Sequence, residues 1–88
     1  MNWVCELTED AMKDLGDVPR AIQKRVARVL AQLETDPFQG DVKALKGDEW
    51  KDVFRRRLGD YRLLFTADRE KGTVHVIRIL LRSGKTYR

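Results

Sequence analysis

Arginine recurs in the second half of the chain at spacings that place several guanidinium groups on one surface. The residues concerned are Arg55, Arg57, Arg62, Arg78 and Arg82, with Lys51 and Lys85 near them in the sequence. From Val42 onward there are 13 Lys or Arg and 6 Asp or Glu residues, whereas the preceding part holds 5 and 8. A guanidinium stays protonated and donates paired hydrogen bonds to carboxylate or phosphate oxygens. The chemistry indicated is the binding of an anion, with phosphate favoured.

Three runs with strand periodicity carry these arginines: residues 50–58, 61–68 and 73–81. The Gly59-Asp60 pair separates the first two runs, and residues 69–72 separate the last two, both of which are hairpin signals. A two-residue turn sets Leu58 opposite Tyr61 and Arg57 opposite Arg62. Like charges placed opposite each other destabilise a sheet, so this pairing again favours an anionic ligand.

Alternation sorts the side chains of the predicted meander onto two faces. One face is expected to join the core and holds Phe54, Leu58, Tyr61, Leu63 and Phe65, while the other holds Lys51, Val53, Arg55, Arg57 and Arg62. In the last strand, the parity that buries Ile77, Ile79 and Leu81 adds Arg78, Leu80 and Arg82 to the arginine side. A slip by one residue in the preceding loop would exchange these faces, and we chose the parity that leaves Arg82 unburied. Arg56 falls among the apolar residues, which requires either a bulge or a side chain that snorkels at the sheet margin.

The first half of the chain predicts a strand and two helices. Residues 2–7 alternate as a short strand, and Thr8 is a suitable N-cap for a helix over residues 9–15 that Gly16 would end. Residues 19–34 carry one apolar face with a spacing typical of a helix. Residues 38–49 read as a loop that contains a brief extended piece over residues 42–45. The sequence predicts a single α+β domain over residues 1–88, with an N-terminal strand, a helical hairpin and a three-stranded antiparallel meander in one sheet, and the helices covering one sheet face.

Composition excludes several classes of protein. The chain has one cysteine, Cys5, and one histidine, His75, which cannot form an internal disulfide and are too few for a zinc site. We expect Cys5 to pack in the core, His75 to be structural, and no metal or cofactor to be needed. Neither a signal peptide nor a membrane span is indicated, which favours a reducing, cytoplasmic setting.

The sequence resembles the RelE/ParE superfamily of small toxins from type II toxin–antitoxin systems. The resemblance rests on residues 54–62 (FRRRLGDYR), residues 68–73 and the tail from Arg82 to Tyr87, and the order of elements covers the whole chain. The Pro37 helix end and the Leu45-Lys46-Gly47 segment match the layout of the family as well.

The RelE branch cleaves messenger RNA on the ribosome by attack of a ribose 2′-oxygen on the adjacent phosphate. The resemblance implies catalytic roles for Arg55, Arg57, Arg62, Arg82 and Tyr87, and it implies RNA contacts by Lys51, Arg78 and Lys85. It also implies an acidic antitoxin, the ribosome and messenger RNA as partners. Preorganised guanidinium groups would stabilise the charge that develops on the phosphate, and Tyr87 would stack on a base.

One departure from the family concerns the general base. RelE carries lysines where this chain has Arg55 and Arg57, and arginine does not readily give up a proton. The base is then Lys51, Lys85 or His75, or the reaction depends on positioning and electrostatics. The alternative function is that of a ParE-like toxin, which binds and inhibits DNA gyrase without cutting RNA, because the central motif occurs in both branches.

Overall fold

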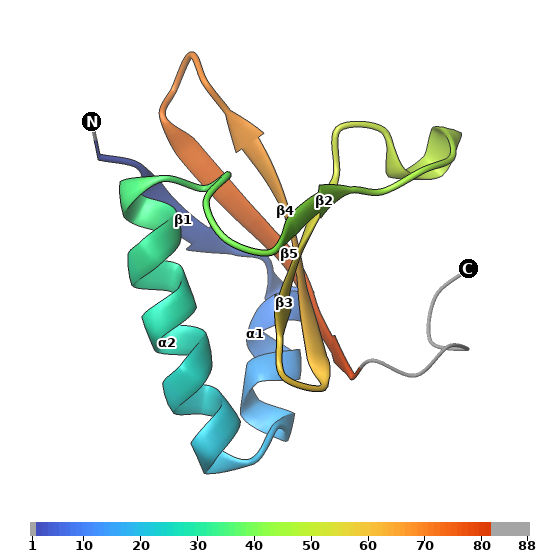
Figure 1. Cartoon of the computed structure of the whole chain (residues 1–88). Helices are drawn as coiled ribbons and strands as arrows, with labels where there is room; N and C mark the ends of the chain where they lie inside the picture. Colours follow the sequence, from blue (N-terminus) through green and yellow to red (C-terminus); the bar gives the residue numbers. More distant parts are fainter. Residues whose placement is uncertain (1, 82–88) are drawn as a thin grey trace.

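The computed structural model describes residues 2–81 and confirms an α+β fold built on one sheet (Figure 1). The five strands are β1 (Val4–Leu7), β2 (Val42–Ala44), β3 (Phe54–Leu58), β4 (Tyr61–Asp68) and β5 (Thr73–Leu81), arranged in the order β1-β5-β4-β3-β2. The meander β3-β4-β5 is antiparallel, as predicted. β1 pairs with β5 in parallel, and the brief extended piece predicted in the loop is β2, which pairs with β3.

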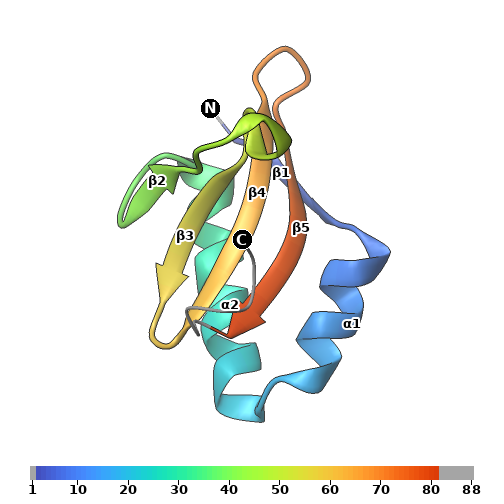
Figure 2. The same ribbon diagram turned by 90° about the vertical axis from the view of Figure 1, so that its right-hand side faces the viewer.

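Two helices complete the domain. Helix α2 (Arg20–Thr35) buries Val26, Val29 and Leu33 in the core that it shares with the sheet. Helix α1 (Glu9–Asp17) lies alongside β5 (Figure 2), so the expectation that both helices cover one sheet face holds for α2 only. None of the helices within residues 2–81 is long and apolar enough to cross a membrane.

The predicted end of α1 is wrong by two residues. Gly16 lies inside the helix, which continues to Asp17, and the residue that ends it is Val18 with φ −85° and ψ 156°. Val18 precedes Pro19, and the proline ring forces the residue before it out of the helical region. The predicted N-cap is confirmed, because Thr8 Oγ1 accepts a hydrogen bond from Ala11 N–H at 3.1 Å.

The strand predicted over residues 50–58 begins only at Phe54. The preceding residues form a short 3-10 helix (Asp48–Trp50) and a local turn in which Val53 N–H donates to the Trp50 carbonyl. Asp52 has φ 62°, a left-handed conformation that aspartate tolerates better than most residues and that a strand does not allow. Lys51 is therefore an exposed turn residue and not part of β3.

A β-bulge in β5 changes the predicted parity of the last strand. Phe65 lies opposite Val76 whereas Leu64 lies opposite Arg78, which leaves Ile77 as an extra residue. As a result Val74, Val76 and Ile79 are the buried residues of β5. Ile79 was predicted correctly, but Ile77 is only half-buried and Leu81 is 52% exposed. The Ile77 carbonyl accepts a hydrogen bond from Thr8 Oγ1 at 3.0 Å, so the cap of α1 also holds the bulge.

The core and its aromatic border agree with the sequence reading of Cys5 and Trp3. Burial, with a smaller contribution from Glu34, raises the pKa of the Cys5 thiol to about 11, and its Sγ–H donates to the Leu30 carbonyl at 3.6 Å. A partly buried thiol of this kind packs as a small hydrophobic group. Trp3 packs edge-on against Phe38.

Asp14 joins α1 to the edge of β5 beyond the end of β1. Its carboxylate accepts hydrogen bonds from Arg78 Nε at 2.7 Å and from Ile79 N–H at 2.9 Å. Burial alone would raise the pKa of Asp14, but the hydrogen bonds from Arg78 and Ile79 outweigh it and lower the pKa below 3.8. The ionised carboxylate therefore stabilises the folded state.

We expect Asp14→Ala to lower the free energy of unfolding by about 2 kcal/mol, which is roughly 8–16 °C in Tm for a domain of this size. The folded pKa is depressed, so the stabilisation is complete above the unfolded pKa and is lost as the pH falls through the folded one. Thermal denaturation should thus show a difference between wild type and variant that is full at pH 7 and shrinks below about pH 4. Asp17→Ala, an exposed change of equal charge on the same helix, should change the free energy by less than about 0.5 kcal/mol. A pH-independent difference for Asp14→Ala would contradict this role of its charge.

Candidate functional site

The strand register gathers the predicted arginines on the sheet face opposite α2. Arg57 lies directly opposite Arg62, and Arg62 lies opposite Leu80 on β5. Arg55 is opposite Leu64 in the next row of the same face. Because cross-strand partners project to the same side of a sheet, Arg55, Arg57 and Arg62 share one surface, which we call the arginine face.

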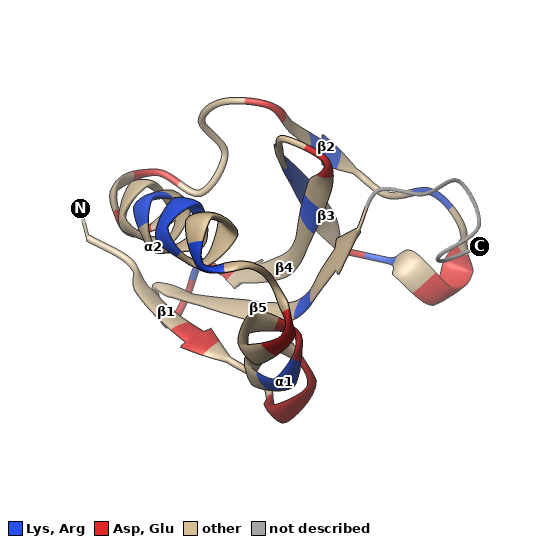
Figure 3. Cartoon of the chain, turned by 90° about the horizontal axis from the view of Figure 1, so that it is seen from below, with Lys and Arg blue, Asp and Glu red and all other residues tan. Residues whose placement is uncertain are grey.

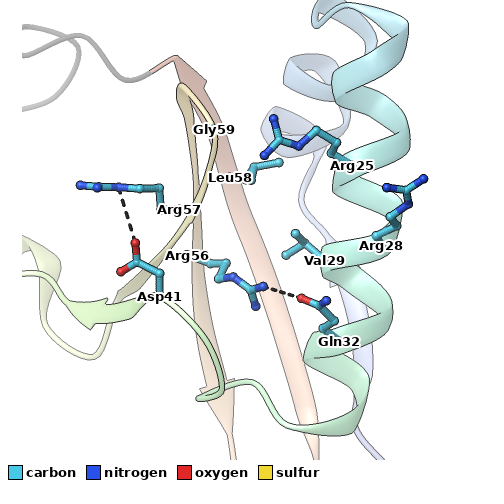
Figure 4. A pocket seen from close by; sticks show the side chains of 9 residues that line it. All are labelled: Arg25, Arg28, Val29, Gln32, Asp41, Arg56, Arg57, Leu58 and Gly59. Atoms are coloured by element: carbon cyan, nitrogen blue, oxygen red, sulfur yellow. Dashed lines mark hydrogen bonds and ion pairs between the residues drawn. The ribbon is translucent and has the colours of Figure 1, made fainter.

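Asp41 pairs with two members of the arginine face and was not identified from the sequence. Arg55 Nη1 lies 3.2 Å from Asp41 Oδ1 and 3.3 Å from the Asp41 carbonyl, and Arg57 Nε lies 3.7 Å from Oδ2 (Figure 4). The Arg55 hydrogen bond, followed by the charges of Arg55, Arg57 and Lys43, lowers the pKa of Asp41 although partial burial opposes it. The signal that could have located Asp41 is its place just before the extended piece 42–45, since pairing of that piece with β3 brings Asp41 beside Arg57.

The members of the arginine face differ in exposure. Arg55 is 7% exposed, so the sequence-based picture of an open guanidinium is wrong for this residue. Arg57 and Arg62 are half-buried. Within the described part of the chain, Arg57 Nε is buried and makes no hydrogen bond. Arg55 therefore acts as a support that orients Asp41, whereas Arg57 and Arg62 are the members that a ligand can reach.

The remaining predicted residues lie apart from this pair. Arg78 begins on the arginine side of β5, but its guanidinium is directed to the strand edge, where it binds Asp14. His75 lies 3.7 Å from Glu6 on the neighbouring strand β1, five positions before Leu80, which is on the order of 15 Å along the strand. That separation is too large for His75 to exchange a proton at Arg62. Arg82, Lys85 and Tyr87 lie outside the described residues.

Arg56 snorkels to the opposite side of the sheet. The register of β3 with β4 is regular from Phe54 to Leu58, so there is no bulge at Arg56. Its guanidinium donates to Gln32 Oε1 on α2 and to the Gln39 carbonyl at 3.3 Å. Of the two explanations open from the sequence, the structure supports snorkelling.

Comparison with known proteins places the sequence and the fold in one family. The family described as ParE toxin of type II toxin–antitoxin system, parDE, matches residues 5–85. The chain belongs to the ParE toxin family. A curated relative, "Putative toxin RelE1" of Methanocaldococcus jannaschii, is 28% identical over 87 residues, which cover 96% of this chain and 94% of the relative.

Solved structures extend the likeness to RelE-type toxins and confirm the RelE/ParE resemblance. The toxin–antitoxin complex RelBE2 of Mycobacterium tuberculosis contains a chain that is 29% identical with a TM-score of 0.83, covering 93% of this chain and 100% of that one. A chain of the archaeal RelE–RelB complex of Pyrococcus horikoshii is 25% identical with a TM-score of 0.79, covering 98% and 100%. This ParE-family protein is thus a toxin of a type II toxin–antitoxin system.

Proposed function

We propose that this toxin is an endoribonuclease that cleaves messenger RNA on the ribosome. The observation that carries the proposal is the placement of Arg57 directly opposite Arg62 on the sheet face away from α2. Two guanidinium groups in this arrangement repel each other, and a phosphate between them would convert repulsion into charge-assisted hydrogen bonding.

In the proposed reaction the ribose 2′-oxygen attacks the adjacent phosphorus while the bond from phosphorus to the 5′-oxygen of the next nucleotide breaks. The products are a 2′,3′-cyclic phosphate and a 5′-hydroxyl group. Arg57 and Arg62 stabilise the charge that builds on the phosphate oxygens, and Arg82 is proposed to join them. The proton of the 2′-hydroxyl leaves to solvent or to Lys51 or Lys85, and Tyr87 stacks on a flanking base.

Asp41 sets a condition for this chemistry. It already occupies the guanidinium of Arg55 and lies beside Arg57, so an incoming phosphate competes with the Asp41 carboxylate for Arg57. The separation of 3.7 Å from Arg57 is longer than a normal hydrogen bond, whereas Arg55 is held at 3.2 Å. We infer that phosphate takes Arg57 and leaves the pair of Arg55 and Asp41 in place.

The proposed partners are an acidic antitoxin, the ribosome and its message in the cytoplasm. The two structural relatives above are named as complexes with RelB or as toxin–antitoxin complexes. Carboxylates of an antitoxin segment would pair with Arg57 and Arg62 when the toxin is idle.

A second candidate is inhibition of DNA gyrase without RNA cleavage. The family match is to a ParE toxin, and the burial of Arg55 leaves fewer accessible guanidinium groups than a nuclease site in which all three are exposed. This candidate also predicts growth arrest on expression, so toxicity alone does not separate the two.

The experiment that tests the nuclease proposal is primer extension on translating ribosomes incubated with the purified chain. We expect new 5′ ends within the message on ribosomes and none on free RNA. Under single-turnover conditions Tyr87→Ala should be slower by about 5–150-fold, which corresponds to loss of base stacking, while Tyr87→Phe should keep most of the rate. Equal rates for all three chains would remove Tyr87 from the site. Absence of any cut, together with inhibition of gyrase-dependent supercoiling, would support the second candidate.

A further inference from the structure

A groove of about 370 Å³ lies between α2 and β3, on the side of the sheet away from the arginine face (Figure 4). Three guanidinium groups project into it from two walls: Arg25 and Arg28 from α2, and Arg56 from β3. The groove ends at the rim where Arg57 meets Asp41. Figure 3 shows the same distribution, with basic residues on α2 and β3 and mostly acidic ones on α1.

The charge of this groove is not balanced by the protein itself. Within residues 2–81, no carboxylate lies within ion-pair distance of Arg25, Arg28 or Arg56, and the single acidic residue of the lining, Asp41, is engaged by Arg55 and Arg57. Arg56 bonds only to the neutral acceptors Gln32 and Gln39. The fold therefore brings like charges together without a counter-charge, an arrangement that an anionic ligand would stabilise.

Two of the guanidinium groups are held in place by close packing. Arg25 lies over Gly59, where an added Cβ would come within 2.6 Å of Arg25 Nη1. Arg56 lies against Gly40, where an added Cβ would be 3.1 Å from Arg56 Cζ. Side chains fixed in this way lose less entropy when they bind a ligand.

The lining of the groove favours a polypeptide over a nucleic acid. Single-stranded nucleic acids are bound by cationic grooves that also offer aromatic rings for base stacking. The nine described lining residues include no aromatic ring, and the apolar ones are the aliphatic Val29 and Leu58. Aliphatic floor and cationic walls suit a segment in which carboxylate side chains alternate with small apolar ones.

We propose that the groove between α2 and β3 binds an acidic polypeptide segment, at a site separate from the arginine face. Its carboxylates pair with Arg25, Arg28 and Arg56, and its chain leaves the groove beside Arg57. The inference rests on the proposed function only in assigning this segment to the antitoxin, which would then hold the toxin on both sides of the sheet.

The test is fluorescence anisotropy of a labelled glutamate-rich peptide with the full chain, compared with a single-stranded oligouridylate of equal net charge. Arg25→Gln with Arg28→Gln should weaken peptide binding by about 5–20-fold, because two charge-assisted contacts are lost. The matched control is Arg20→Gln with Lys24→Gln, which removes the same charge from exposed positions of α2 outside the groove. It should change peptide affinity by less than about twofold.

Two results would overturn the proposal. Equal loss of peptide affinity in the groove variant and the control would show a general charge effect. A larger loss for oligouridylate than for the peptide would make the groove a nucleic-acid site. Failure of the nuclease proposal would appear separately, as absence of message cleavage with groove binding intact.

Discussion

Arg62→Ala is expected to lower the single-turnover rate of message cleavage by about 10²–10³-fold, since it removes a preorganised cation from the developing phosphate charge. The fold should survive, because Arg62 is half-buried and lies opposite the like-charged Arg57. Relief of that repulsion should leave Tm unchanged or raise it by a few degrees. The measurement is cleavage of ribosome-bound message at saturating enzyme, paired with thermal denaturation of the same preparation.

The matched control for this variant is Arg20→Ala, which removes one positive charge from an exposed position in the first turn of α2. Its cleavage rate should equal that of the wild type. A Tm loss of more than about 8 °C for Arg62→Ala would identify Arg62 as a structural residue, and an unchanged rate would remove it from the proposed site.

Phe65→Ala is expected to have the largest effect on stability, about 3–5 kcal/mol out of a total on the order of 4–13 kcal/mol for a domain of this size. Phe65 is fully buried, its ring stacks on Phe54 with centroids 5.7 Å apart, and it lies opposite Val76 at the bulge. Truncation would open a cavity between the sheet and α2. Urea denaturation should show a lower midpoint with little change in the slope.

Phe65→Leu is the control that separates a cavity from the loss of an aromatic ring. It keeps most of the buried volume and should cost less than about 1.5 kcal/mol. If both variants were equally destabilised, the stacking with Phe54 and not the buried volume would dominate at this position.

Local sequence patterns predicted the hairpins and helices because the forces that set them act between near neighbours. The Gly59-Asp60 turn fixed the register of β3 with β4, including the Arg57 and Arg62 pair. The bulge at Ile77 could not be read from the sequence, since it depends on a hydrogen bond from Thr8, 69 positions away. The true end of α1 was readable from Pro19, but the glycine two residues earlier was given more weight than the proline.

The site followed the same division. Alternation placed Arg55, Arg57 and Arg62 on one face, which the register confirms. It did not predict the burial of Arg55 or its pairing with Asp41, because both depend on β2 returning to pair with β3. Likewise, the departure of Arg78 toward Asp14 depends on where α1 lies against β5. The catalytic roles of these residues remain predictions.

The parallel pairing of β1 with β5 has a consequence for when the toxin can act. Val4 is translated near the start of the chain but finds its partner, Thr73, only after the last strand has been made. Val74, Val76 and Ile79, which fill much of the core, arrive with that strand. Contacts so distant in sequence close late and slowly. A nascent chain therefore lacks a folded core for most of its synthesis, and the interval in which an antitoxin must capture it opens at release from the ribosome that made it.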